Sequence, residues 1–94
     1  MNIVKYNESF TITDSTDKFE IKGDIARSMS GSLNIHFNVN TISGEYFGDC
    51  HYNKYAENNT VNFGINCSEE NRDEFTEYVN TIINSVLNYF ETLN

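Results

Sequence analysis

The sequence predicts an α+β protein, in which an antiparallel β-meander of 4–5 strands is covered on one face by one long amphipathic C-terminal helix. Two patterns support this prediction. Over residues 9–67 apolar side chains alternate with polar ones, as in strands that bury one face. Over residues 69–92 apolar side chains recur every three or four positions, as on one side of a helix. A length of 94 residues fits a single domain spanning residues 1–94.

Five alternating runs predict the strands, and short polar runs separate them. The separating runs, at 14–17, 28–32, 41–44 and 57–59, are rich in Asp, Ser, Asn and Gly, which favour turns. We expect the following apolar or small residues on the covered face: Phe10 and Ile12; Phe19, Ile21 and Ile25; Leu33, Ile35, Phe37 and Val39; Tyr46, Gly48, Cys50 and Tyr52; Val61, Phe63, Ile65 and Cys67.

The alternation also predicts how the last three strands pair, because side chains of one face must meet across each hairpin. The expected pairs are Val39–Tyr46, Phe37–Gly48, Ile35–Cys50 and Leu33–Tyr52 in one hairpin, and Tyr55–Thr60, Tyr52–Phe63 and Cys50–Ile65 in the next.

The helix is expected from about Glu69 to Thr92, with Ser68 as its N-cap. At 1.5 Å per residue it is ~36 Å long, whereas a strand of six or seven residues spans only ~20–23 Å. The helix must therefore cross the sheet diagonally or overhang it. Its apolar stripe is Phe75, Val79, Ile82, Val86, Phe90 and Leu93. We expect Phe37, Cys50, Phe63, Ile65, Val79, Ile82 and Val86 to be mostly buried.

The net charge of −8 is concentrated in the second half of the chain. Residues 1–40 carry four basic and five acidic side chains, whereas residues 41–94 carry two basic and nine acidic ones. Such a balance disfavours direct binding of nucleic acid or of an anionic membrane, and it favours a basic protein partner. The N-terminus lacks a signal-peptide core and no run reaches the ~20 apolar residues of a membrane span, so we expect a cytoplasmic protein.

The acidic residues Glu69, Glu70, Asp73, Glu74 and Glu77 form the first candidate site. One interpretation is that they only favour the helix macrodipole and solvate the outer side of the helix. The other is that they mimic nucleic acid, because five charges over these turns give one per ~2.5–3 Å of helix axis, comparable with the ~1.7 Å of a DNA duplex. Such a stripe fits a basic groove.

Two further candidate sites, a histidine cluster and a pair of cysteines, follow from the predicted sheet. The expected register sets His36 opposite Asp49, with His51 two residues along, and the interpretations are a solvated cluster or a shallow divalent-metal site. Cys50 and Cys67 are interpreted as reduced thiols that pack as small apolar groups. We expect no cofactor and no structural metal.

Phe47 is the fourth candidate, because it interrupts an otherwise polar outer sheet face. A single exposed aromatic residue often has no role, but a flat Asn-rich face centred on one also suits a protein contact.

No nucleotide-binding loop, metalloprotease motif, CxxC pair or nucleophile elbow occurs, so we expect no enzymatic activity. In size, charge and lack of catalytic motifs the chain resembles small acidic viral and mobile-element proteins that inhibit host nucleases, the anti-CRISPR proteins among them. The resemblance involves no diagnostic residues and so implies no residue-level site.

The leading hypothesis is therefore a non-enzymatic inhibitor that binds a basic protein, for example a nucleic-acid-binding nuclease, through the acidic helix. A toxin-immunity protein fits the same features. A structural or assembly protein that forms a homodimer through the sheet or the helix end is the alternative from another class. A small enzyme or metal binder that uses His36, Asp49 and His51 is the third hypothesis.

Overall fold

A computed structural model describes residues 2–6 and 9–92 of the chain. Its elements, in chain order, are β1 (Asn2–Tyr6), β2 (Ser9–Ser15), β3 (Phe19–Arg27), β4 (Leu33–Thr41), β5 (Tyr46–Tyr55), β6 (Thr60–Cys67), the 3₁₀-helix η1 (Glu69–Asn71) and the helix α1 (Arg72–Thr92). Each strand pairs antiparallel with the next, so the sheet order is the chain order. The predicted α+β meander with one C-terminal helix is confirmed, but the sheet has six strands and not four or five.

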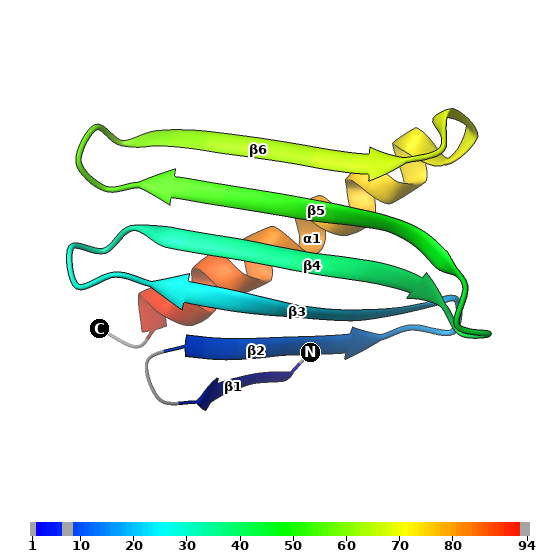
Figure 1. Cartoon of the computed structure of the whole chain (residues 1–94), viewed down its shortest axis with the longest axis horizontal. Coiled ribbons are helices and arrows are strands. Elements are labelled where there is room, and N and C mark those ends of the chain that lie inside the picture. Colours follow the sequence, from blue (N-terminus) through cyan, green and yellow to red (C-terminus); the bar gives the residue numbers. More distant parts are fainter. Residues whose placement is uncertain (1, 7–8, 93–94) are drawn as a thin grey trace.

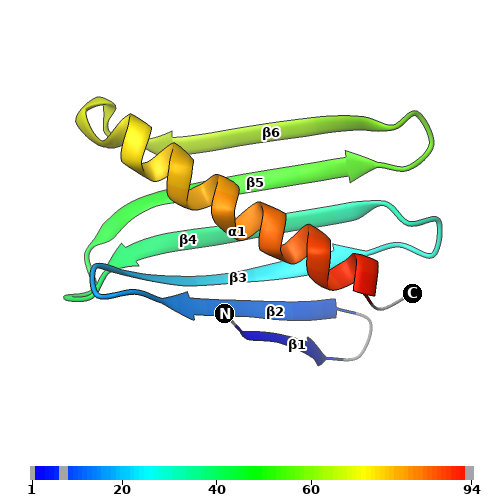
Figure 2. The same ribbon diagram turned by 180° about the vertical axis from the view of Figure 1, so that it is seen from behind.

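The helix α1 crosses one face of the sheet diagonally (Figures 1 and 2). It starts beyond the end of β6 and ends over β2, where Phe90 packs edge-on against Phe10 with their ring centroids 4.9 Å apart. The opposite face, which we call the outer face, is covered by no other element of the described chain. Two corners of the helix side are also left open by the diagonal, and one of them lies over β5 and β6.

The core lies between the sheet and α1, as the two periodicities require. The apolar positions of β2, β3 and β4 are buried, and α1 buries Phe75, Val79, Ile82, Ile83, Val86 and Phe90. Leu93, the last residue of the predicted stripe, lies outside the described residues. The prediction of burial is wrong for Phe63, which is 42% exposed, and Ile65 is only partly buried. Both belong to β6, and α1 runs away from β6 as it crosses the sheet.

The register of the β5–β6 hairpin agrees with the prediction: the pairs are Tyr55–Thr60, Tyr52–Phe63 and Cys50–Ile65. The predicted register of the β4–β5 hairpin is wrong by two residues, since Phe37 pairs with Cys50 and not with Gly48. A β-bulge accounts for one of these two residues, and a turn one residue longer than predicted accounts for the other. Gly48 pairs with Val39 and Tyr46 with Asn40, so Phe47 is an extra residue on β5.

The bulge reverses the predicted directions of two aromatic residues. Phe47 turns to the helix side, where its ring centroid lies 4.6 Å from that of Phe19 and 5.7 Å from that of Phe75. Tyr46, predicted on the covered face, is instead 61% exposed, and its hydroxyl donates a hydrogen bond to Asp49.

The strand β1 was not predicted, because Asn2–Tyr6 carries too short an alternation to distinguish a strand from a coil. It extends the sheet by pairing with β2, from Asn2 opposite Thr13 to Tyr6 opposite Ser9. Ile3 packs against the core from this edge.

Candidate protein-binding surface

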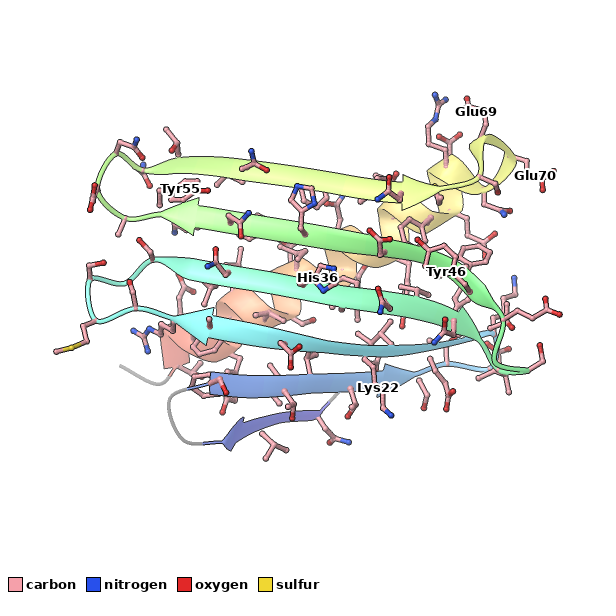
Figure 3. The ribbon with its side chains drawn as sticks, in the orientation of Figure 1. Lys22, His36, Tyr46, Tyr55, Glu69 and Glu70 are labelled. Carbon is pink, nitrogen blue, oxygen red and sulfur yellow. The ribbon has the colours of Figure 1, made fainter. Side chains whose placement is uncertain are left out.

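The five carboxylates predicted as a binding stripe lie together at one end of the molecule. Glu69 and Glu70 belong to η1, and Asp73, Glu74 and Glu77 belong to the first two turns of α1. Figure 3 shows Glu69 and Glu70 beyond the end of β6, away from the sheet. We call these five residues the acidic surface.

The acidic surface is open to solvent. The side chains of Glu69, Asp73 and Glu74 are 84%, 95% and 54% exposed, and Glu70 and Glu77 are exposed as well. Asp73 and Glu77 are four residues apart in α1 and therefore point the same way, opposite the buried Phe75. Both also line a shallow depression along the outer side of α1. Their carboxylates are thus accessible to another molecule.

Two cations lie next to the acidic surface. Arg72 contacts Glu69 at 3.2 Å and Asp73 at 3.5 Å, and Lys18, from the turn between β2 and β3, contacts Glu74 at 3.6 Å. All of these side chains are more than half exposed, and such ion pairs contribute only ~0–1 kcal/mol. Within the described residues no ion pair joins Glu70 or Glu77 to a cation. The five carboxylates therefore exceed these two neighbouring cations by three negative charges.

The position of the acidic surface also fits a structural role at the start of the helix. Glu69, Glu70, Asp73 and Glu74 lie where backbone N–H groups are unpaired and the macrodipole is positive. Ser68 precedes η1 as predicted, but its Oγ accepts a hydrogen bond from the Asn71 side chain at 2.7 Å and caps no backbone N–H. Glu77 lies beyond the first turn of α1, so the macrodipole does not account for it.

Phe47 is not available as the centre of an outer-face contact. Its ring packs between Phe19 and Phe75 on the helix side, because the bulge rotates it away from the polar face. The prediction of an exposed Phe47 on the outer face is therefore wrong.

The histidine cluster also differs from the predicted arrangement. His36 lies opposite His51, and Asp49 lies opposite Asn38. The hydroxyl of Tyr46 donates to one carboxylate oxygen of Asp49 and the amide of Asn66 donates to the other at 3.0 Å. The bond from Tyr46 is the main cause that lowers the pKa of Asp49, and the same bond raises the pKa of Tyr46.

These bonds leave Asp49 poorly placed as a metal ligand. Across residues 2–6 and 9–92 no group of three His, Cys, Asp or Glu side chains has the geometry to hold a metal ion. His51 is held elsewhere, with Nε2 3.1 Å from Oδ1 of Asn62 and its ring lying over Gly64.

The two cysteines are free thiols on the helix side of the sheet. Cys50 is fully buried, and burial raises the pKa of its thiol to about 12. Cys67, at the end of β6, is only partly buried. A thiol with so high a pKa is a poor nucleophile at neutral pH, so Cys50 acts as a small apolar group of the core.

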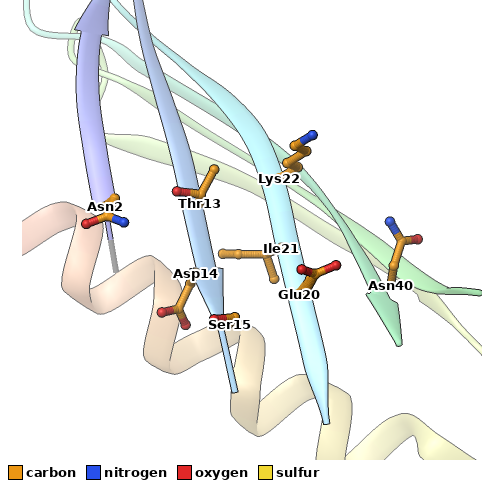
Figure 4. Close-up of a pocket in the computed structure, with 8 residues that line it drawn as sticks. All are labelled: Asn2, Thr13, Asp14, Ser15, Glu20, Ile21, Lys22 and Asn40. Atoms are coloured by element: carbon orange, nitrogen blue, oxygen red, sulfur yellow. The ribbon is translucent and has the colours of Figure 1, made fainter. Parts of the chain in front are cut away.

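A cavity of about 470 Å³ opens at the end of β1, as Figure 4 shows. Its lining is mostly polar, and one side of it is open where β2 continues past the first residue of β1. The lining residues are Asn2, Thr13, Asp14, Ser15, Glu20, Ile21, Lys22 and Asn40. They combine one lysine with two carboxylates and include no His or Cys.

The sequence did not predict an exposed apolar area on β6. Val61 and Phe63 point to the helix side but lie in the corner that α1 leaves open, where they are 49% and 42% exposed. Tyr52, opposite Phe63, borders the same area with ring centroids 6.1 Å apart. The alternating pattern gave the direction of these side chains but not the path of the helix over them.

Comparison with protein-family models, with curated proteins and with solved structures finds no significant match. In the described part of the chain no helix has both the length and the apolar character needed to span a bilayer.

Proposed function

We propose that this protein is a non-enzymatic inhibitor that binds a basic protein through the acidic surface. One observation favours this role above the others: five exposed carboxylates gather at one end of the molecule, and among the described residues only Arg72 and Lys18 form ion pairs with them. A field of this sign attracts a basic surface and repels nucleic acid and anionic lipid.

The most specific form of the proposal is mimicry of a nucleic acid. A groove built for DNA or RNA presents Lys and Arg at the spacing of phosphates. The helix α1 offers Asp73, Glu74 and Glu77 at a comparable spacing, within a rise of ~6 Å along its axis. The inhibited protein is then a nucleic-acid-binding nuclease, such as the targets of anti-CRISPR proteins, in the cytoplasm. A toxin-immunity role uses the same chemistry with a basic toxin as the partner.

The first step of the test is to capture the partner from a lysate of the native host and to identify it by mass spectrometry. Association of the purified partner is then measured with the wild type and with the triple variant Asp73→Asn/Glu74→Gln/Glu77→Gln. Because long-range charge acts mainly on association, we expect the triple variant to lower the on-rate at least tenfold. Binding to the wild type should weaken as salt rises, and DNA or RNA bound by the partner should compete.

A matched control removes three charges elsewhere. Glu45, Glu57 and Glu91 are exposed and lie outside the acidic surface, so the variant Glu45→Gln/Glu57→Gln/Glu91→Gln has the same net charge as the triple variant. We expect it to retain most of the on-rate. Equal binding by the wild type and the triple variant would exclude the acidic surface as the contact. An equal fall of the on-rate in the triple variant and in the control would show an effect of net charge and not of the acidic surface.

A further inference from the structure

We propose that β6 pairs antiparallel with β6 of a second copy of this chain, joining two sheets across a two-fold axis. The proposal does not depend on the acidic surface or on the function inferred from it. It starts from the position of β6, which is the last strand of the sheet and, of the strands that the structure describes, pairs only with β5.

The free edge of β6 has none of the features that keep sheet edges apart. Natural proteins protect such edges with lysine or proline, with bulges, or by making the strand very short. Thr60–Cys67 is eight residues long, carries no charged residue and no proline, and pairs with β5 without a bulge. The strand at the opposite edge, β1, has five residues.

Two side chains of β6 on the outer face are held back from the edge. The amide of Asn66 donates to Asp49 at 3.0 Å, and Oδ1 of Asn62 lies 3.1 Å from Nε2 of His51, so both side chains lean over β5. Gly64, between them, has no side chain. Another strand can therefore approach the backbone of β6 on this side without displacing a large group.

On the helix side an incoming strand would cover apolar surface. Val61 and Phe63 are 49% and 42% exposed there. Residues opposite each other in an antiparallel pair project from the same face of the sheet. With the two-fold axis near Phe63 and Gly64, Val61 and Phe63 of both copies therefore lie together on the helix side and form one apolar area. Burial of that area adds to the backbone hydrogen bonds of the new pair.

Charge favours a second copy over a basic partner at this edge. The chain has a net charge of −8, but β6 itself carries no charged residue. A basic partner would find no negative charge on β6 to pair with, whereas two copies of β6 can meet without direct repulsion. Antiparallel pairing also places the two acidic surfaces, which follow Cys67, at opposite ends of a strand ~27 Å long. Charges that far apart are screened, because the Debye length is ~10 Å at 0.1 M salt.

The test is the oligomeric state of the full chain by light scattering over a range of concentrations. We expect the wild type to approach twice its monomer mass of 10.8 kDa as concentration rises. The variant Val61→Lys/Phe63→Lys should remain at the monomer mass, because lysines there meet across the axis. As a control, Val4→Lys adds one lysine to a valine of the other edge strand, β1, that is 58% exposed, and this variant should dimerise like the wild type.

Amide hydrogen exchange of the wild type supplies a second readout that needs no variant. We expect protection of β6 amides to increase from dilute to concentrated samples while that of β1 amides does not change. A wild type that is monomeric at all concentrations would overturn the proposal, whether another protein covers the edge or nothing does. A dimer that persists in the β6 variant, or exchange at β6 independent of concentration, would place the contact elsewhere and overturn it equally.

Discussion

The ring of Phe75 in α1 packs on Gly48 in β5 so closely that the glycine has no room for a side chain. A Cβ at Gly48 would lie 2.7 Å from Cζ of Phe75 and 2.5 Å from the carbonyl oxygen of Asn66. The contact joins the first turn of α1 to the bulged end of β5. It therefore sets how α1 leaves the sheet at the end that carries the acidic surface.

Gly48→Ala should destabilise the fold by about 1–3 kcal/mol, the cost of overpacking a tightly filled core. Gly64→Ala, in the neighbouring strand, is the matched control. The three atoms nearest to its new methyl group all belong to the imidazole of His51, which is partly exposed and can rotate away. Urea unfolding of both variants measures the difference, and equal midpoints would show that Phe75 does not pack on Gly48.

Ile82→Ala should cost about 2–5 kcal/mol, because it removes a side chain that is only 3% exposed at the centre of the apolar stripe. That loss is large beside the ~5–15 kcal/mol of a typical small protein. Asn84→Ala, on the exposed side of α1, should leave the stability nearly unchanged. An unchanged denaturation midpoint for Ile82→Ala would contradict the packing of α1 on the sheet.

Tyr78 should lower the stability of the protein at high pH. Burial, together with the charge of Asp14 and the hydrogen bond that Tyr78 donates to it at 3.3 Å, raises the pKa of Tyr78 to about 12. The unfolded chain releases this proton near pH 10. The stabilising contribution is thus complete below pH 10 and is lost as the pH rises from about 10 to about 12.

The comparison of wild type with Tyr78→Phe isolates this effect, since the other five tyrosines are common to both proteins. Urea midpoints between pH 8 and pH 12 should fall more steeply for the wild type. Parallel curves would mean that Tyr78 titrates alike in the folded and unfolded chains.

The two thiols should react at different rates with iodoacetamide in the native protein at pH 8. Cys67 is partly exposed, whereas Cys50 is fully buried with a pKa of about 12, so only Cys67 should be alkylated quickly. Mass spectrometry of the digested protein measures each rate. In urea both should react, and similar native rates would show that Cys50 is not in the core.

The sequence predicted hairpin pairing well where the strands are regular and poorly where one is not. The β5–β6 register is correct because alternation continues without interruption on both strands. The β4–β5 register fails because the turn is one residue longer than predicted and the bulge at Phe47 adds a second residue. The bulge also reverses the directions predicted for Phe47 and Tyr46. The sequence Phe47-Gly48 is compatible with a regular strand and with a bulged one, so the pattern alone does not reveal the bulge.

For the candidate sites, the sequence predicted the direction in which side chains point better than it predicted which of them α1 covers. Asp73, Glu74 and Glu77 are exposed because they lie opposite or beside the apolar stripe of α1, and that stripe is visible in the sequence. The exposure of Phe63 was missed because it depends on the diagonal path of α1. That path is set by contacts distant in sequence, such as Phe10 with Phe90 and Asp14 with Tyr78.

The order of elements along the chain has a consequence for synthesis on the ribosome. All six strands pair with their sequence neighbours and can form hairpins as they emerge, but α1 follows them and is made later. Until α1 arrives, the apolar faces of β2, β3 and β4 have no cover. The nascent sheet is then the species most prone to aggregate, and slow translation through residues 69–92 would lengthen its lifetime.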